Sequence, residues 1–206
     1  MSNFIKIKSE LDNRGIFLDT VPNDIFNIID REIKNKKIDE RKNLAGHIQE
    51  EYKIENVDEK VQKYILKLPS KCSYLQEYSN RIKILDKNLP YFLSNMWVNY
   101  QKKHEFNPIH THTGVFSFVI FNKIPYNLED EFKVFPIVNN NVHKTSCLEF
   151  VINSSYSQMN TYTLSVDKSF VGKIVMFPAM LPHLVYPFYT SDDYRITVSG
   201  NISLKT

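Results

Sequence analysis

The chain has 206 residues, of which 42% are hydrophobic and 24% charged, and its formal net charge is +3. Such a chain is long enough for one domain with a sizeable core, and its composition is that of an ordinary globular protein. The small net charge, without a long basic block, gives no clear signal for nucleic acid, and no apolar run approaches the ~20 residues of a membrane span.

The N-terminus and the cysteines indicate the compartment. The first residues lack the apolar core of a signal peptide, so a cytoplasmic location is expected, in the cytoplasm of a host if the chain is phage-encoded. Only two cysteines, Cys72 and Cys147, are present, which is too few for a disulfide framework. We expect two buried thiols, with a disulfide between them as the alternative.

The first 90 residues predict two short strands followed by helices. Residues 4–7 and 16–18 are apolar or alternating and flank turn residues at 12–15, which indicates a hairpin or strands added to the edge of a sheet. Apolar residues at helical spacing follow in three segments: 25–33, 57–68 and 75–82. Pro69 should end or kink the second helix. These helices are expected to brace a sheet.

After Leu89-Pro90 the pattern changes to short strands separated by turn residues, without helical periodicity between them. The predicted strands are 96–100, 115–121, 147–152, 160–166, 172–177, 183–188 and 195–204. This spacing is typical of an all-β sandwich or barrel. The polar, Asn-rich segment 125–145 interrupts the series, and we expect it to be a long loop over the mouth of a pocket. The chain is expected to form a single domain over residues 1–206, with helical support in 1–90 and a β core in 91–206.

Histidines stand at the ends of two of these strands. His110 and His112 follow the turn Asn107-Pro108, and His183 begins a later strand. Alternate residues of a strand share a face, so the first two imidazoles should point the same way, and a third from a strand distant in sequence could complete one side of a metal ion. Three nitrogen donors suit Fe(II), Zn, Cu or Ni and leave coordination positions open. Arg195, placed just beyond, could receive a carboxylate through a bidentate fork.

From about Trp97 to its end the chain resembles the 2-oxoglutarate- and Fe(II)-dependent oxygenases, in the branch that includes prolyl 4-hydroxylases, and it looks most like oxygenases encoded by tailed, particularly marine, phages. Four segments carry the resemblance: NPIHTHTG at 107–114, SFVI at 117–120, GKIVMFP at 172–178 continuing to His183, and YRITVSGN at 194–201. The resemblance as a whole covers about half of the chain, and its distal block is the more specific part.

The resemblance implies a mainly β fold, in which a double-stranded β-helix, or jelly roll similar to the cupins, carries iron at its mouth. Iron would be held by His110, His183 and the residue two after the first histidine. That residue is Asp or Glu in most of the superfamily and is His112 here. His112 could ligate, as in the three-histidine site of cysteine dioxygenases, or stand aside, or a carboxylate such as Glu149 could complete the triad. We favour the first, because a strand puts residues two apart on one face.

The resemblance also implies a site for the cosubstrate. Arg195 would bind the far carboxylate of 2-oxoglutarate, and Thr197 would take the place of an assisting serine. Tyr100 resembles a tyrosine that contacts the cosubstrate, with an ordinary core tyrosine as the alternative. Asn99 faces the opposite way, so only one of these two should point inward. His104 and His143 have no place in the pattern and are expected in loops.

The activity implied is hydroxylation of a peptide side chain or a small molecule by a ferryl oxidant, with succinate and CO2 as co-products. Two other functions stay open. One is a cupin-like metalloprotein that uses three histidines without 2-oxoglutarate, and the other is a non-enzymatic phage structural module. Arg195 and the metal content distinguish them.

Overall fold

The computed structural model of the chain describes residues 3–6, 15–35, 38–81, 89–135, 143–153 and 159–205. The predicted turn residues 12–14, the end of the third helical segment at Ile82 and residues 136–142 of the insertion lie outside these ranges. In the described part, no helix is long and apolar enough to cross a membrane.

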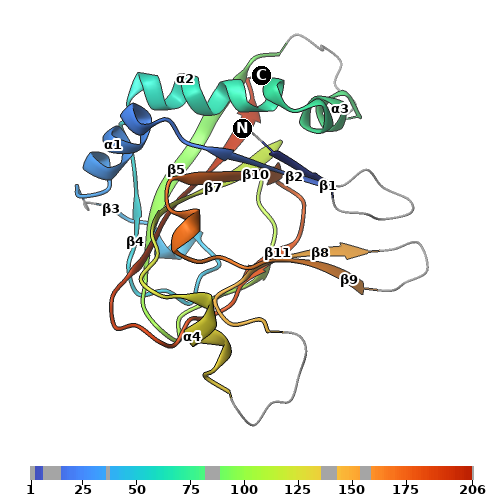
Figure 1. The fold of residues 1–206 in the computed structure, drawn as a ribbon. Helices are drawn as coiled ribbons and strands as arrows, with labels where there is room; N and C mark the ends of the chain where they lie inside the picture. The colour runs from blue at the N-terminus through green and yellow to red at the C-terminus, as the bar shows by residue number, and fades with distance from the viewer. Residues whose placement is uncertain are drawn as a thin grey trace.

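Two antiparallel sheets form the body of the molecule (Figure 1). The larger has the order β1-β2-β10-β7-β12-β5-β4-β3, and the smaller has the order β6-β11-β8-β9. The strands of the larger sheet are β1 (Asn3–Lys6), β2 (Gly15–Thr20), β3 (Ile38–Asp39), β4 (Glu51–Lys53), β5 (Tyr91–Gln101), β7 (Phe116–Lys123), β10 (Lys173–Pro178) and β12 (Arg195–Leu204). Those of the smaller sheet are β6 (Asn107–His110), β8 (Leu148–Asn153), β9 (Met159–Leu164) and β11 (His183–Val185).

Helices cover one face of the larger sheet (Figure 1). They are α1 (Asn23–Glu32), α2 (Glu59–Lys67) and α3 (Ser73–Arg81). Their apolar stripes, with Ile29 and Ile65 fully buried, pack on outward-facing residues of the sheet such as Val98 and Phe118. Each large apolar side chain buried in this way contributes roughly 1.5–3 kcal/mol. The predicted bracing layer is therefore present.

The ends of the helices follow local rules. The Asp58 carboxylate caps α2 by accepting from the backbone N–H of Lys60 at 2.8 Å. The helix ends at Lys67, and Pro69 lies in the short 3-10 helix η2 (Leu68–Lys71) that follows, as its effect on a helix requires. Two further 3-10 turns are η1 (Arg41–Asn43) and η3 (Lys168–Phe170).

The other face of the larger sheet points inward, to a second core shared with the smaller sheet. On β12, Arg195, Thr197 and Ser199 face this interior, whereas Ile196 and Val198 belong to the helix-side core. A mainly β body with two facing antiparallel sheets and helices on one side is the double-stranded β-helix that the sequence predicts. Its interior holds the candidate site.

The seven predicted strands after residue 90 all exist, but the sequence missed some elements. The strand expected at 183–188 ends at Val185, and β3, β4 and β6 were not predicted. The insertion 125–145, expected to be a loop, contains the short helix α4 (Leu128–Phe132). The N-terminal strands form both arrangements that were considered, since β1 pairs with β2 as a hairpin and β2 adds to β10 at the edge of the sheet. Both cysteines are free and buried.

Candidate functional site

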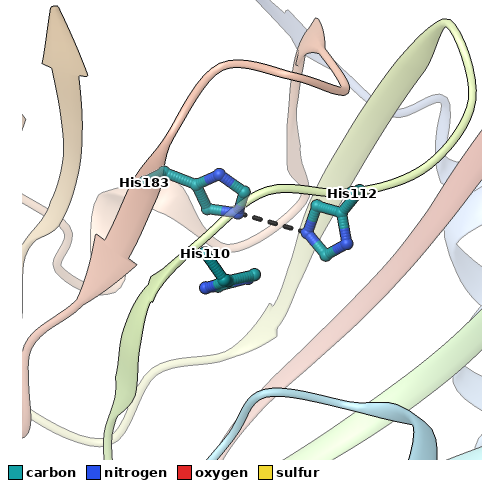
Figure 2. Close-up of side chains that lie close together, drawn as sticks. All are labelled: His110, His112 and His183. Atoms are coloured by element: carbon teal, nitrogen blue, oxygen red, sulfur yellow. Dashed lines mark hydrogen bonds between the residues drawn. The ribbon is translucent and has the colours of Figure 1, made fainter.

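Three histidines meet between the two sheets (Figure 2). His110 is the last residue of β6, and His183, the first residue of β11, is its direct cross-strand partner. His112 lies two residues further along the chain than His110. One nitrogen from each of the three rings lies within 4.8 Å of the others, and among the described residues this is the one such group of potential metal ligands.

The approach of His112 has a different cause from the one predicted. We expected His110 and His112 to share a strand face, but β6 ends at His110 and His112 lies in the loop that follows. The backbone N–H of His112 donates to the carbonyl of Ala179 at 2.9 Å, in the turn that precedes β11. This bond fixes the loop beside the facing strand, so the ring is brought to the cluster by the loop and not by strand alternation.

Backbone carbonyls set the tautomers of two rings. The Nδ1 of His110 donates to the carbonyl of Pro108 at 2.7 Å, and the Nδ1 of His183 donates to that of Leu181 at 2.9 Å. A carbonyl only accepts, so in each neutral ring the proton is on Nδ1 and the lone pair is on Nε2. Metal-ligating histidines are commonly oriented by such a bond from their second nitrogen. Both rings are therefore prepared to coordinate through Nε2.

The spacing of two of the donor atoms fits a metal ion. The Nε2 atoms of His112 and His183 are 3.2 Å apart (Figure 2). Two nitrogens each about 2.1 Å from one ion are separated by roughly 3.0 Å at a right angle and roughly 3.4 Å at the tetrahedral angle. The observed separation lies between these values, so neither ring has to move far to share an ion.

Burial keeps the cluster neutral. It is the largest cause that lowers the pKa of all three rings, and the repulsion between neighbouring imidazoles lowers it further for His112 and His183. The pKa of His112 falls to about 4. Neutral imidazole is the form that binds a metal, so these rings offer their lone pairs at neutral pH without first losing a proton.

Glu149, the alternative third ligand, has other partners. Its carboxylate is buried, accepts from the Tyr186 hydroxyl at 2.9 Å and from the hydroxyl of Thr163 at 3.2 Å, and is paired with the Lys144 ammonium. These bonds hold it on β8, outside the group of three histidines. The ligand set that the structure brings together is thus the all-histidine one.

A cavity of about 60 Å³ joins the histidines to Arg195. Its apolar wall includes Phe177 and Leu148, and its polar wall comes mostly from the inward faces of two neighbouring strands. The inward residues of these two strands are Trp97, Asn99 and Gln101 on β5, and Arg195, Thr197 and Ser199 on β12. The space between the sheets therefore has a three-nitrogen end and a cationic end, as a chelating acid with a second carboxylate requires.

Arg195 is a buried cation surrounded by neutral hydrogen-bond acceptors. Its side chain is 2% exposed. Its five N–H groups donate to Gln101 Oε1 (twice), the Tyr126 hydroxyl, and the carbonyls of Ser146 and Tyr186, at 2.6–3.1 Å. All of these acceptors are neutral, and no carboxylate of the described chain lies within ion-pair distance of the guanidinium. A desolvated charge in this state strongly favours an incoming anion.

The structure places Thr197 and Tyr100 differently with respect to the cavity. Thr197 lines it and accepts from the Asn99 amide at 3.4 Å. Tyr100 points the other way, into the helix-side core, where its hydroxyl donates to the carbonyl of Ile33 at 2.7 Å. Tyr100 therefore lies in the core, as the alternative held, and does not line the cavity that joins the histidines to Arg195. Neighbouring residues of a strand face opposite sides of the sheet, and of this pair Asn99 is the one that faces the cavity.

Sequence reasoning missed several residues of the site. Trp97 and Gln101 share the inward face of β5 with Asn99, and the Trp97 ring lies 5.7 Å from that of His112. Alternation along a strand would have found all three, once the inward face was known. Tyr126, from the insertion, carried no signal in the sequence.

The remaining histidines lie apart from the cluster. His47 stacks on Phe106, and His143 stacks on Phe132. His104 is in the turn after β5, at φ 71°, with its ring edge-on to a tyrosine. His104 and His143 are outside the helices and strands, as expected, and His47 forms an isolated β-bridge with Phe106.

Comparisons with known proteins identify the family of the chain and solved structures with a similar fold. A family model described as "Putative 2OG-Fe(II) oxygenase" matches residues 95–201, about half of the chain. Among solved structures, a Pseudomonas putida prolyl-4-hydroxylase is similar, with 12% identity, a TM-score of 0.51 and 94% of each chain covered. The protein OsALKBH1 gives 9% identity and a TM-score of 0.53, with 97% of this chain and 99% of that chain covered. IDO from Bacillus thuringiensis gives 10% identity and a TM-score of 0.50, with 99% of this chain and 100% of that chain covered.

At such identities these structures establish the fold alone. No curated protein matches the sequence. The predicted phage origin is not tested by these comparisons and stays a prediction.

Proposed function

We propose, because the chain belongs to the 2OG-Fe(II) oxygenase family, that His110, His112 and His183 hold Fe(II) and that Arg195 binds the far carboxylate of 2-oxoglutarate. The chain is an Fe(II)- and 2-oxoglutarate-dependent oxygenase. These assignments name the residues of this chain that would hold the metal and the cosubstrate. The observation that carries them is the buried guanidinium of Arg195, which shares one cavity with three neutral imidazoles and has no counter-ion among the residues that the structure describes.

When bound, Fe(II) and 2-oxoglutarate supply the oxidising chemistry, using O2 and giving succinate and CO2 as co-products. The protein supplies orientation and a dry site. The carbonyls of Pro108 and Leu181 hold the rings of His110 and His183 so that Nε2 faces the cavity. Apolar residues around the histidines, among them Phe177, exclude water and strengthen the attraction between Arg195 and a carboxylate.

His112 is proposed as the third ligand in place of the usual carboxylate. Its support is the 3.2 Å separation from His183 and the lack of any described carboxylate in the cluster. His112→Ala and His112→Asp separate this proposal from the one in which His112 stands aside. If His112 ligates, the alanine variant binds Fe(II) more weakly and the aspartate variant recovers part of the affinity. Equal Fe(II) affinity in wild type and His112→Ala would contradict it.

The direct test of function is turnover. Purified protein loaded with Fe(II) is incubated with 2-oxoglutarate and O2, and succinate is measured. We expect Fe(II)-dependent succinate formation even without a primary substrate, because such enzymes turn over slowly when uncoupled. No succinate from protein with verified iron, over a panel of candidate substrates, would contradict the proposed function.

Arg195 also distinguishes the rival function of a three-histidine metalloprotein that does not use 2-oxoglutarate. Such a protein has no need for a desolvated cation in the metal cavity. Unchanged affinity for 2-oxoglutarate after substitution of Arg195 would favour the rival. A preparation that binds no metal would favour the non-enzymatic module.

The primary substrate is proposed to be a peptide side chain or a small molecule, by analogy of fold. Succinate formation above the uncoupled rate identifies it, and nucleic acid oligomers belong in the same panel. We further propose that residues 1–206 act as one domain, because β2, β3 and β4 from the first 90 residues lie in the sheet that carries Arg195.

A further inference from the structure

Gln101 is a buried polar residue with no catalytic chemistry of its own. It ends β5, is 4% exposed, and lines the cavity. Its backbone is the direct cross-strand partner of Arg195 on β12. A glutamine rarely occupies a site buried to this degree unless each end of its amide has a partner.

The amide holds one edge of the Arg195 guanidinium. Gln101 Oε1 accepts from Nε at 3.0 Å and from Nη2 at 2.6 Å. The orientation of the amide follows from its other end, where Nε2 donates to the carbonyl of Glu105 at 2.5 Å. The opposite orientation would turn the NH2 group toward the guanidinium and leave the Glu105 carbonyl without this donor, so only one orientation satisfies both ends.

The hydrogen bond from Gln101 to Glu105 also links Arg195 to β6, the strand that carries His110. The Glu105 carboxylate accepts from the backbone N–H groups of Lys102 at 2.8 Å and Gln49 at 3.2 Å, which makes the turn after β5 rigid. This turn leads directly into β6, whose last residue is His110. Gln101 therefore connects the cationic end of the cavity to the segment that sets the metal end.

We propose that Gln101 is a positioning residue for the cosubstrate, acting through Arg195. It fixes the rotamer of the guanidinium relative to β6, and it does so with a neutral oxygen. A glutamate would reach equally far but would neutralise the cation, so the neutral amide leaves the charge of Arg195 for the far carboxylate of 2-oxoglutarate. This role rests on the proposed function.

The test compares two keto acids that differ only at the far end. The probes are 2-oxoglutarate and 2-oxopentanoate, which has a methyl group where 2-oxoglutarate has its far carboxylate. Their Kd values are measured by calorimetry under anaerobic conditions on Fe(II)-loaded protein, for wild type, Gln101→Leu and Gln101→Glu. Gln62→Leu is the matched control, because the Gln62 amide also donates to a backbone carbonyl, at 2.8 Å from Val57 O, but on α2.

The expected result is a loss of preference and not a general loss of binding. Wild type and Gln62→Leu should bind 2-oxoglutarate at least about 30-fold more tightly than 2-oxopentanoate, since the attraction between a buried charge and a carboxylate contributes that much. Gln101→Leu should reduce this ratio about tenfold, and Gln101→Glu should reduce it to near one, since its carboxylate replaces that of the cosubstrate. The Kd of 2-oxopentanoate and the Fe(II) content should stay unchanged.

Two results would overturn the role of Gln101. One is an unchanged ratio in Gln101→Leu, and the other is an equal loss for both keto acids, which a merely structural residue would give. If the leucine variant does not fold, a wild-type ratio in the isosteric Gln101→Glu variant overturns it as well. A wild-type protein without any preference would instead contradict the proposed function, and this role with it.

Discussion

Replacement of Arg195 by methionine tests the cationic end of the cavity. Methionine keeps much of the volume and removes the charge together with all five N–H donors. The variant leaves four oxygens without their donor: Gln101 Oε1, the Tyr126 hydroxyl, and the carbonyls of Ser146 and Tyr186. Both stability and affinity should therefore change, in different ways.

The effect on stability is a balance of two contributions. An orphaned buried acceptor costs about 1–3 kcal/mol, and four acceptors lose a donor here. Removal of a buried charge that no described carboxylate neutralises offsets part of this cost. We expect Arg195→Met to lower the free energy of unfolding of the ligand-free protein by about 2–4 kcal/mol.

Arg195→Met should also weaken the binding of 2-oxoglutarate strongly. The attraction between a buried guanidinium charge and a carboxylate in a dry cavity contributes roughly 2–4 kcal/mol, so the Kd of 2-oxoglutarate should rise about 30- to 1,000-fold. Urea unfolding measures both quantities, because a ligand at 100 times its Kd adds about 2.7 kcal/mol to the free energy of unfolding. With Fe(II) under anaerobic conditions, this gain should appear in wild type, and Arg195→Met should gain less than about 1 kcal/mol at the same ligand concentration.

A surface cation gives the control. Lys123 pairs with Asp193 at 2.6 Å on an exposed part of the molecule. Lys123→Met should change stability by less than about 0.5 kcal/mol and leave the affinity for 2-oxoglutarate unchanged. The reasoning is refuted if Arg195→Met binds 2-oxoglutarate as tightly as wild type does.

Three further substitutions test other parts of the structure. His183→Ala should lower the Fe(II) affinity at least about 100-fold, since even the outer partners of metal ligands contribute about 10- to 100-fold. Elemental analysis measures the iron content, and His143→Ala, a loop control, should keep it in full. Full iron occupancy in His183→Ala would show that the ligand set is wrong. Burial raises the pKa of Glu51 to about 7 from an ordinary value of 4.5, so the unfolded chain loses its proton first as pH rises. Stability should then fall between about pH 4.5 and 7 by at most roughly 3 kcal/mol, and Glu51→Gln should remove this slope in urea titrations, whereas an unchanged slope would exclude Glu51 as its source. At Gly200 a Cβ would meet the ring of Phe118 at 2.7 Å, so Gly200→Ala should lower the free energy of unfolding by roughly 1–3 kcal/mol, and a stability equal to wild type would contradict the close packing.

The fold could be predicted where the periodicity was strong. The strand expected at 195–204 is β12 with the same bounds, because polar and apolar residues alternate along the sequence RITVSGNISL. β4 was missed, since Glu51–Lys53 is only three residues long and polar at both ends. Its existence depends on pairing with β5, which is a tertiary contact that no local pattern records.

The site was predictable in its residue types and less so in its geometry. His110, His112 and His183 do converge, but His112 does so from a loop held by the Ala179 carbonyl. Tyr100 shows the second difficulty. Either it or its neighbour had to face inward, and the choice depends on how β5 pairs with its neighbours and on which face the helices cover, so a single sequence could not make it.

The most direct test of the whole account is a crystal structure of the protein grown anaerobically with Fe(II) and 2-oxoglutarate, with anomalous scattering measured at the iron edge. We expect one iron peak about 2.1 Å from nitrogens of His110, His112 and His183, and the far carboxylate of 2-oxoglutarate against the guanidinium of Arg195. An iron peak elsewhere, or the cosubstrate bound away from Arg195, would contradict the account.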